Sequence, residues 1–132
     1  VLTQGVWDLI HEGHARYLQK AKAQGDILIV GVDSDKLTRQ RKGPRRPIVP
    51  EDERIRMISH LRHVDIITTR HAKDEIGKLI YTVEPDVLIV SKSTEDFPTK
   101  DQAEEHMQTI AFSKLIGITG IIEVSNKHDW FL

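Results

Sequence analysis

Cysteine is the most informative absence in this sequence of 132 residues, which contains none. A chain without cysteine has no disulfide framework, no thiolate metal site and no cysteine nucleophile. An excess of one charge is absent as well, because 19 Lys and Arg residues face 20 Asp and Glu residues and the formal net charge is −1. This balance argues against a protein held mainly to nucleic acid or to an acidic membrane surface.

Long apolar runs are missing too. No stretch approaches the ~18 apolar residues of a membrane span, and no signal peptide is visible, so we expect a cytoplasmic protein. The composition, 39% hydrophobic and 30% charged, is that of an ordinary globular domain, and the chain is long enough to bury a core. We expect a single domain over residues 1–132 that lacks the start of its first strand and a C-terminal helix.

Aliphatic runs and amphipathic segments alternate along the chain. Continuous β-branched and aliphatic runs are typical of parallel strands covered on both faces. The alternation predicts an α/β fold, a Rossmann-like, doubly wound sheet of five parallel strands with helices on both faces. The expected strands are residues 1–3, 27–32, 64–69, 86–90 and 118–124, the expected helices are residues 15–23, 36–40, 51–61, 74–83 and 101–112, and the main loops are residues 41–50 and 91–100.

Residues 5–14, GVWDLIHEGH, lie where the first strand passes into the first helix. In an open α/β sheet this junction is at the carboxyl edge, where ligands bind. The first N–H groups of the helix lack intrahelical partners and lie at the positive end of its dipole, so an anion is the natural ligand. Gly13 lets a phosphate approach the backbone, and His11 and His14, three residues apart, face the same phosphate-sized space.

Such an arrangement suits attack on the α-phosphate of a nucleoside triphosphate. The protein then has mainly to position the groups and to stabilise charge on the phosphoryl oxygens. A phosphate nucleophile needs no general base, because its second pKa is near about 6. The His-x-x-His pair alone would also fit a metal pair or two ordinary loop histidines, but the whole stretch with Asp8 and Gly13 is more specific.

With these residues the chain resembles the cytidylyltransferase-like nucleotidyltransferases, whose signature is G-x-[FY]-D-x-x-H-x-G-H. Trp7 stands where Phe or Tyr is usual. The segment that joins Lys42-Gly43 to Arg46-Pro47 most resembles heptose-phosphate adenylyltransferase domains, followed by ethanolamine-phosphate and glycerol-3-phosphate cytidylyltransferases. Further matches within residues 1 to about 90 are residues 25–32, Ser34-Asp35, Glu53-Arg54 and Val64-Asp65.

The resemblance implies transfer of CMP or AMP from CTP or ATP to a phosphorylated small alcohol or sugar, with release of pyrophosphate. Mg²⁺ is expected to accompany the triphosphate. Catalytic roles are implied for His11, His14 and Lys42, and acceptor binding for Arg46 and Arg62. The expected nucleotide-binding residues are Gly5, Val6, Trp7, Asp8, Gly13, His14 and Arg54.

Asp8 is the one possible protein ligand for the metal that the resemblance suggests, although it could instead stabilise its turn. Arg54 and Arg62 are eight apart on one expected helix and could share a face. For these two, surface pairing with Glu51 or Asp65 is the alternative interpretation.

A second candidate element is a cluster of five cations at residues 39–46, in and beside a loop rich in Pro and Gly. A solvated basic loop is the ordinary interpretation. Here the loop follows the carboxyl edge of the sheet, and the resemblance assigns its Lys-Gly segment to phosphate binding. His60 and His63 form another His-x-x-His pair, but they have no glycine and no strand before them, so we expect a surface pair.

Two departures from the family pattern are visible. Residues 91–94, SKST, replace a Gly/Asp-rich segment, and this altered segment motivates the rival class, a non-catalytic nucleotide-binding module. An Ile-Ser-Thr-Thr-like motif is also missing, and we expect it to belong to a segment outside this chain. A fragment of a class I aminoacyl-tRNA synthetase is less consistent with a short, nearly neutral chain that lacks a Lys-Met-Ser-Lys-Ser segment. The apolar residues 130–132 suggest a homodimer or packing under a further helix.

Overall fold

The computed structural model of the protein describes residues 1–74, 77–91 and 120–124. Five strands form one sheet in the order β3-β2-β1-β4-β5, and every neighbouring pair is parallel. This confirms the predicted α/β fold with a parallel, Rossmann-like sheet. The strands are β1 (Leu2–Gly5), β2 (Ile29–Asp33), β3 (Ile66–Arg70), β4 (Val87–Ser91) and β5 (Gly120–Val124).

The strand order reverses beside β1. From β1 the chain adds β2 and then β3 on one side, and it later crosses to add β4 and β5 on the other. Ligands bind outside the carboxyl ends of the strands at such a switch point, because the connections on either side leave in opposite directions. The turn that follows β1 therefore lies at the expected place for a site.

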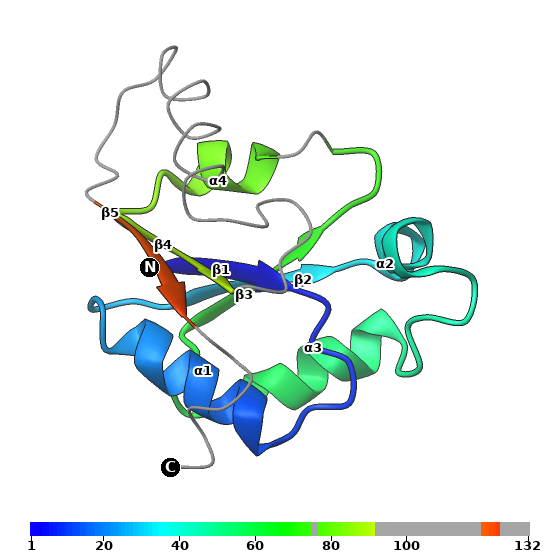
Figure 1. Ribbon diagram of the computed structural model, residues 1–132, viewed down its shortest axis with the longest axis horizontal. Coiled ribbons are helices and arrows are strands. Elements are labelled where there is room, and N and C mark those ends of the chain that lie inside the picture. Colours follow the sequence, from blue (N-terminus) through cyan, green and yellow to red (C-terminus); the bar gives the residue numbers. More distant parts are fainter. Residues whose placement is uncertain (75–76, 92–119, 125–132) are drawn as a thin grey trace.

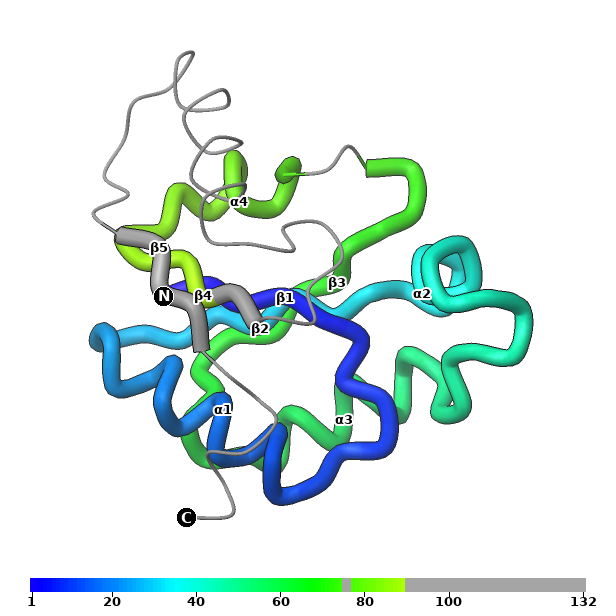
Figure 2. The backbone as a smooth tube through the Cα atoms, viewed as in Figure 1, coloured from blue at the N-terminus to red at the C-terminus, as the bar shows by residue number. Residues whose placement is uncertain are grey.

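Helices cover both faces of the sheet, as predicted. Figure 1 shows α1 (Glu12–Lys22) and α3 (Glu51–Ser59) beneath the sheet and α4 (Lys78–Val83) above it. The short helix α2 (Asp35–Lys42) extends beyond the carboxyl end of β2. The tube trace shows the segment between α2 and α3 coming back toward the turn that precedes α1 (Figure 2).

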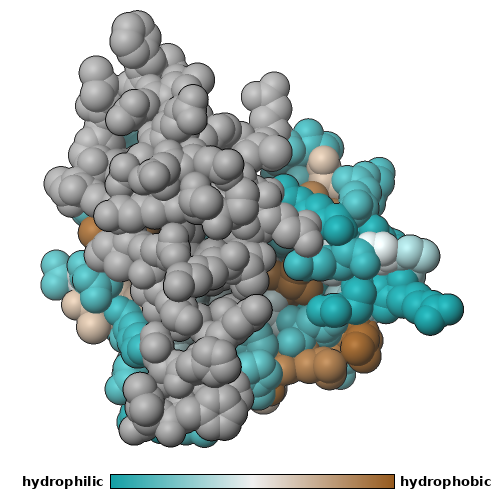
Figure 3. All heavy atoms as spheres, in the orientation of Figure 1, coloured by the Kyte–Doolittle hydropathy of each residue, from teal (hydrophilic) through white to brown (hydrophobic). Residues whose placement is uncertain are grey.

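The core has one apolar cluster on each side of the sheet. The larger cluster packs α1 and α3 against the sheet and includes Leu18, Val30 and Ile58, which are each at most 1% exposed. The smaller cluster joins Leu2 and Leu88 to Ile80 of α4. In Figure 3 hydrophilic side chains gather on the side of the molecule where α2 lies. Within the described part of the chain, no helix combines the length and apolarity needed to cross a membrane.

Several element boundaries differ from the prediction. The helix α1 begins at Glu12, three residues before the expected start, because His11 caps it. The helix α2 runs on to Lys42 and stops at Gly43, whose φ of 99° is outside the range that side-chain-bearing residues favour. The end of α3 falls at Ser59. The expected helix 101–112, residues 92–100 and the apolar residues 130–132 lie outside the described residues.

Candidate functional site

The turn between β1 and α1 has an unusual backbone. Trp7 and Leu9, on either side of Asp8, have φ values of 59° and 50°. Residues other than glycine seldom adopt this left-handed region, and each such residue costs roughly 1–3 kcal/mol, so the surroundings must hold it there.

The indole of Trp7 provides part of that support. Its Nε1–H donates to the carbonyl oxygen of Gly31 at 3.1 Å, and its ring lies 5.9 Å from the rings of both His14 and Tyr17. A Cβ on Gly5 would lie 3.3 Å from the indole, so the glycine leaves room for this ring. Gly5 and Trp7, predicted to bind nucleotide, thus also shape the turn, and their contact with a ligand stays a prediction.

The N-terminus of α1 is closed by two histidines that cap it reciprocally. Nδ1 of His11 accepts a hydrogen bond from the Gly13 backbone N–H at 2.9 Å, and Nδ1 of His14 accepts one from the His11 N–H at 3.2 Å. Because both Nδ1 atoms accept, the proton of each neutral ring is assigned to Nε2. The rings lie side by side, with centroids 4.1 Å apart. The structure therefore brings His11, Gly13 and His14 together at one helix start.

This capping role was missed by the sequence reasoning, although a signal for it exists. In a capping box the residue three positions after the N-cap reaches back to the N-cap backbone N–H. The spacing of His11 and His14 is the same as in that motif, with imidazole nitrogens in place of hydroxyl and carboxylate oxygens.

Burial keeps His14 neutral. The pKa of His14 falls from 6.5 to about 4, because the half-buried ring is desolvated and His11 lies beside it, while the Asp8 carboxylate acts in the opposite direction. At neutral pH the imidazole is therefore an uncharged hydrogen-bond donor. A bound anion would favour the charged form and raise the pKa again.

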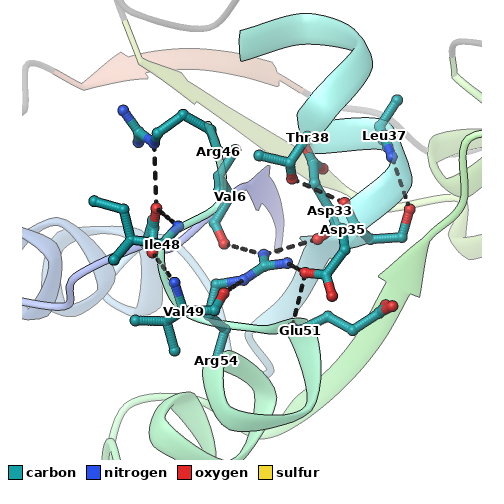
Figure 4. A network of polar contacts seen from close by, with 12 residues as sticks. Val6, Asp33, Asp35, Leu37, Thr38, Arg46, Ile48, Val49, Glu51 and Arg54 are labelled. Carbon is teal, nitrogen blue, oxygen red and sulfur yellow. Dashed lines mark hydrogen bonds and ion pairs between the residues drawn. The ribbon is translucent and has the colours of Figure 1, made fainter. Parts of the chain in front are cut away.

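Asp8 clamps a distant loop onto this turn. Its side chain is only 2% exposed. Oδ2 accepts hydrogen bonds from the backbone N–H of Ile48 at 2.8 Å and from Nε of Arg46 at 3.2 Å, and Oδ1 accepts one from the Val49 N–H at 3.0 Å (Figure 4). Burial alone would raise the pKa of Asp8, but the two N–H groups and the Arg46 guanidinium outweigh it and hold the pKa below 3.8.

These contacts bear on the possible metal role of Asp8. Both carboxylate oxygens already accept hydrogen bonds, and the charge is compensated by a guanidinium, so Asp8 has a structural role in this arrangement. Its possible role as a metal ligand stays a prediction. In the described ranges, no group of three or more His, Cys, Asp or Glu residues is placed to hold a metal ion.

Arg54 lies in the interior beneath the same turn, with a side chain that is 1% exposed. Its Nη1 donates to the carbonyl oxygens of Val6 at 2.6 Å and Asp33 at 2.7 Å, which follow β1 and end β2. Its Nε donates to the Val49 carbonyl at 2.8 Å, and its Nη2 to Oδ1 of Asp35 at 2.8 Å (Figure 4). Arg54 therefore ties together four segments at the carboxyl edge.

These contacts narrow the interpretations of Arg54 that the sequence left open. It is not in a surface pair with Glu51 or Asp65, since its carboxylate partner is Asp35. Asp65 pairs instead with Lys22. Nucleotide binding by Arg54 stays a prediction, and the structure assigns the residue a structural position.

A buried ion pair joins the carboxyl ends of β2 and β3. Nε and Nη2 of Arg70 donate to the two carboxylate oxygens of Asp33 at 2.7 and 3.0 Å. The two residues are partners in the strand register, each the last of its strand. The sequence analysis did not predict this pair, although opposite charges at the ends of two adjacent strands were a usable signal.

The remaining cationic candidates lie nearer the surface. Lys42 is the exposed last residue of α2, and the side chain of Arg46 is 43% exposed. Arg62 is exposed and follows the end of α3, so the expectation that it shares a helix face with Arg54 is wrong. The reason is that the helix stops at Ser59 and a turn begins. Acceptor binding by Arg46 and Arg62 stays a prediction.

Comparison with known proteins gives relatives along the whole chain. The bifunctional protein HldE of Helicobacter pylori strain J99 is 46% identical over 98% of this chain, a match that takes up 28% of that protein. HldE of Desulfatibacillum aliphaticivorans is 42% identical over 67% of this chain and 18% of its own length. The chain thus spans less than a third of the length of these curated relatives.

Solved structures agree on the fold. The crystal structure of the lipopolysaccharide core biosynthesis protein from Thermoplasma volcanium superposes with a TM-score of 0.74 at 28% identity, covering 94% of this chain and 93% of that one. Pantoate-β-alanine ligase from Francisella tularensis, at 17% identity and a TM-score of 0.58, shares the fold alone.

A sequence model described as cytidylyltransferase-like matches residues 2–124. The match includes the turn, the capped helix start and the loop that Asp8 holds. Given this coverage, the chain belongs to the cytidylyltransferase-like family of nucleotidyltransferases.

Proposed function

We propose that this domain is an adenylyltransferase that transfers AMP from ATP to a phosphorylated sugar, with heptose phosphate as the acceptor class, and releases pyrophosphate. The observation that carries the proposal is the pair of histidines on the N-terminus of α1. Nδ1 of each ring is used by the backbone, which directs the Nε2–H side of His11 and His14 away from the helix as a donor. Together with the helix dipole, these donors favour a phosphate.

The chemistry needs no protein base. An oxygen of the acceptor phosphate attacks the α-phosphorus, a new P–O bond forms, and the bond to the oxygen of the departing pyrophosphate breaks with its electron pair. Charge on the equatorial oxygens is stabilised by preorganised donors, and a neutral His14 serves as one at physiological pH. The phosphate nucleophile is already mostly dianionic there, because its second pKa is about 6.

The choice of ATP and a sugar rests on similarity. The segment from Lys42-Gly43 to Arg46-Pro47 resembles heptose-phosphate adenylyltransferase domains, and the relative at 46% identity is a bifunctional HldE protein. The similar Thermoplasma volcanium structure is that of a lipopolysaccharide core biosynthesis protein, which favours a sugar acceptor over a small alcohol.

We further propose that Mg²⁺ arrives with the triphosphate. Its ligands would then be phosphate oxygens and water, since Mg²⁺ usually keeps several waters and binds substrate phosphates. Asp8 has the different task of holding the loop that contains Arg46.

Pyrophosphate release from full-length protein tests the proposal. ATP and CTP are each paired with heptose phosphate, ethanolamine phosphate and glycerol 3-phosphate, in the presence of Mg²⁺. We expect release only with ATP and heptose phosphate. Release with CTP and an alcohol phosphate would overturn the assignment of substrates. Nucleotide binding in a calorimeter without release from any pair would favour the non-catalytic module.

A further inference from the structure

The ion pair between Asp8 and Arg46 joins a buried group to an exposed one. The carboxylate is 2% exposed and the arginine side chain 43%. The contact uses only Nε of the guanidinium, which lies 3.2 Å from Oδ2 of Asp8. Figure 4 shows the outer end of the Arg46 guanidinium pointing away from Ile48. The two Nη groups therefore face outward from a fixed inner contact.

Asp8 also fixes the backbone from which Arg46 projects. The N–H groups of Ile48 and Val49 both donate to the same carboxylate, which pins the chain just beyond Pro47. On the other side, the backbone N–H of Arg46 donates to the Gly43 carbonyl at 3.2 Å. An arginine held at its Nε and along its backbone is preorganised, so less freedom is lost when its Nη groups bind a ligand.

The contact with Asp8 ties Arg46 to the turn that leads to the paired histidines. Asp8 lies in the turn that leads to α1, and its charge is felt by the imidazole of His14. An in-line displacement requires the attacking phosphate and the departing pyrophosphate on opposite sides of the α-phosphate. The helix start with His11 and His14 suits the α-phosphate that is attacked. The attacking phosphate of the acceptor is a second anion, and it needs a separate group to position it.

We propose that Asp8 is a positioning residue that presents the Nη groups of Arg46 to the terminal phosphate monoester of the acceptor. The inference rests on the proposed transfer to a phosphorylated sugar. A guanidinium offers two parallel N–H donors that match a phosphate, whereas an ammonium is a point charge. Arg46 would thus select acceptors that carry a terminal phosphate, and Asp8 would act through Arg46 without touching the substrate.

The first test separates the acceptor from the nucleotide. In the full-length protein, Arg46→Met keeps the apolar stem and removes the guanidinium. We expect KM for heptose phosphate to rise about 10- to 100-fold, the range expected for a lost charge-assisted hydrogen bond, and KM for ATP to change less than about twofold. Arg56→Met is the matched control, because Arg56 is 65% exposed and pairs only with Asp52 on α3 among the described contacts.

The second test asks whether Asp8 acts through Arg46. Asp8→Asn is expected to raise KM for heptose phosphate in the native background and to add little in the Arg46→Met background. If the two substitutions instead raise KM for heptose phosphate independently, so that their fold-changes multiply in the double variant, the positioning role of Asp8 is overturned. If Asp8→Asn does not fold, Arg46→Lys replaces it: a lysine has no separate Nε with which to contact Asp8, so KM should stay at least about tenfold raised. Full rescue by lysine would overturn the proposal.

Calorimetric titration keeps this inference distinct from the proposed reaction. The inference would be supported and the proposed reaction overturned if the wild type binds heptose phosphate but releases no pyrophosphate, and if Arg46→Met no longer binds heptose phosphate. The inference would be overturned, and the proposed reaction would stand, if the wild type turns over normally and Arg46→Met weakens the binding of ATP alone or of neither substrate. A parallel titration with inorganic phosphate shows whether the sugar is needed for recognition. We expect inorganic phosphate to bind the wild type more weakly than heptose phosphate does, and not to bind Arg46→Met.

Discussion

The backbone N–H of His11 lies 3.2 Å from Nδ1 of His14, so the imidazole proposed to stabilise the reacting phosphate also closes the N-terminus of α1. One side chain thus has a structural task on one ring nitrogen and, in the proposed reaction, a catalytic task on the other. Simple removal of His14 cannot separate the two tasks, but the capping motif suggests a substitution that can.

His14→Ala and His14→Gln should differ in stability and agree in activity. Glutamine is a normal residue at this position of a capping box, so it can accept the His11 N–H, whereas alanine cannot. We expect alanine to lower stability by about 1 kcal/mol and glutamine to restore most of it. In both variants kcat should fall about 10²- to 10³-fold, because neither side chain supplies the imidazole donor.

Steady-state kinetics and urea unfolding on the two variants decide the question. Because the donor acts on charge that develops during transfer, kcat and kcat/KM should fall together while KM for ATP changes little. A glutamine variant with near-normal kcat would show that the role of His14 is structural only.

The depressed pKa of His14 also predicts how stability depends on pH. With a pKa of about 4 in the folded protein against 6.5 when unfolded, the unfolded state binds more protons between these values. The neutral His14 therefore contributes to the free energy of unfolding fully above pH 6.5, and this contribution is lost as the pH falls toward 4. His14→Gln has no such pH-dependent contribution. In urea unfolding the variant should therefore gain stability relative to wild type as the pH falls from 7.5 to 5. Parallel pH profiles of the two proteins would contradict the shift.

Trp7→Phe should weaken the turn although Phe is usual in the family. Phenylalanine cannot donate to the carbonyl of Gly31, which accepts from the indole Nε1 at 3.1 Å. Leaving this buried acceptor without its donor should lower the free energy of unfolding by about 1–3 kcal/mol. Urea unfolding measures the loss, with kcat as a second readout, since His14 packs against the same indole. An unchanged midpoint would mean that the hydrogen bond adds nothing.

The sequence predicted the sheet, and it predicted that the candidate site lies between the first strand and the first helix, because both features leave local patterns. Aliphatic runs marked the strands, and the His-x-Gly-His spacing marked the helix start beside β1. The clamp at Asp8 left no such pattern, because two of its partners are backbone N–H groups of Ile48 and Val49, about 40 residues away, and a backbone donor is the same for nearly every residue type.

The buried position of Arg54 was missed for a related reason. Arginine is mostly a surface residue, so surface pairing and ligand contact were the natural expectations. Three of its hydrogen bonds go to carbonyl oxygens, which no sequence pattern identifies. Charged interior residues of this kind become visible only when the strand ends are placed in space.

Arg54 also provides the sharpest test of stability at this edge. Arg54→Met leaves the carboxylate of Asp35 without this partner and removes the donor from the carbonyls of Val6, Asp33 and Val49. We expect a loss of about 3–5 kcal/mol in the free energy of unfolding, as for other broken buried pairs.

The matched control is Arg56→Met, two residues along the same helix. Arg56 is 65% exposed and its contact with Asp52 is 3.4 Å long, so its removal should change stability by less than about 0.5 kcal/mol. Arg54→Lys should remain strongly destabilised, because one ammonium cannot reach four separated acceptors. If Arg54 instead contacts the nucleotide, Arg54→Lys should unfold near the wild-type midpoint and show a raised KM for ATP. Urea unfolding and KM for ATP on the same preparation therefore distinguish the two roles.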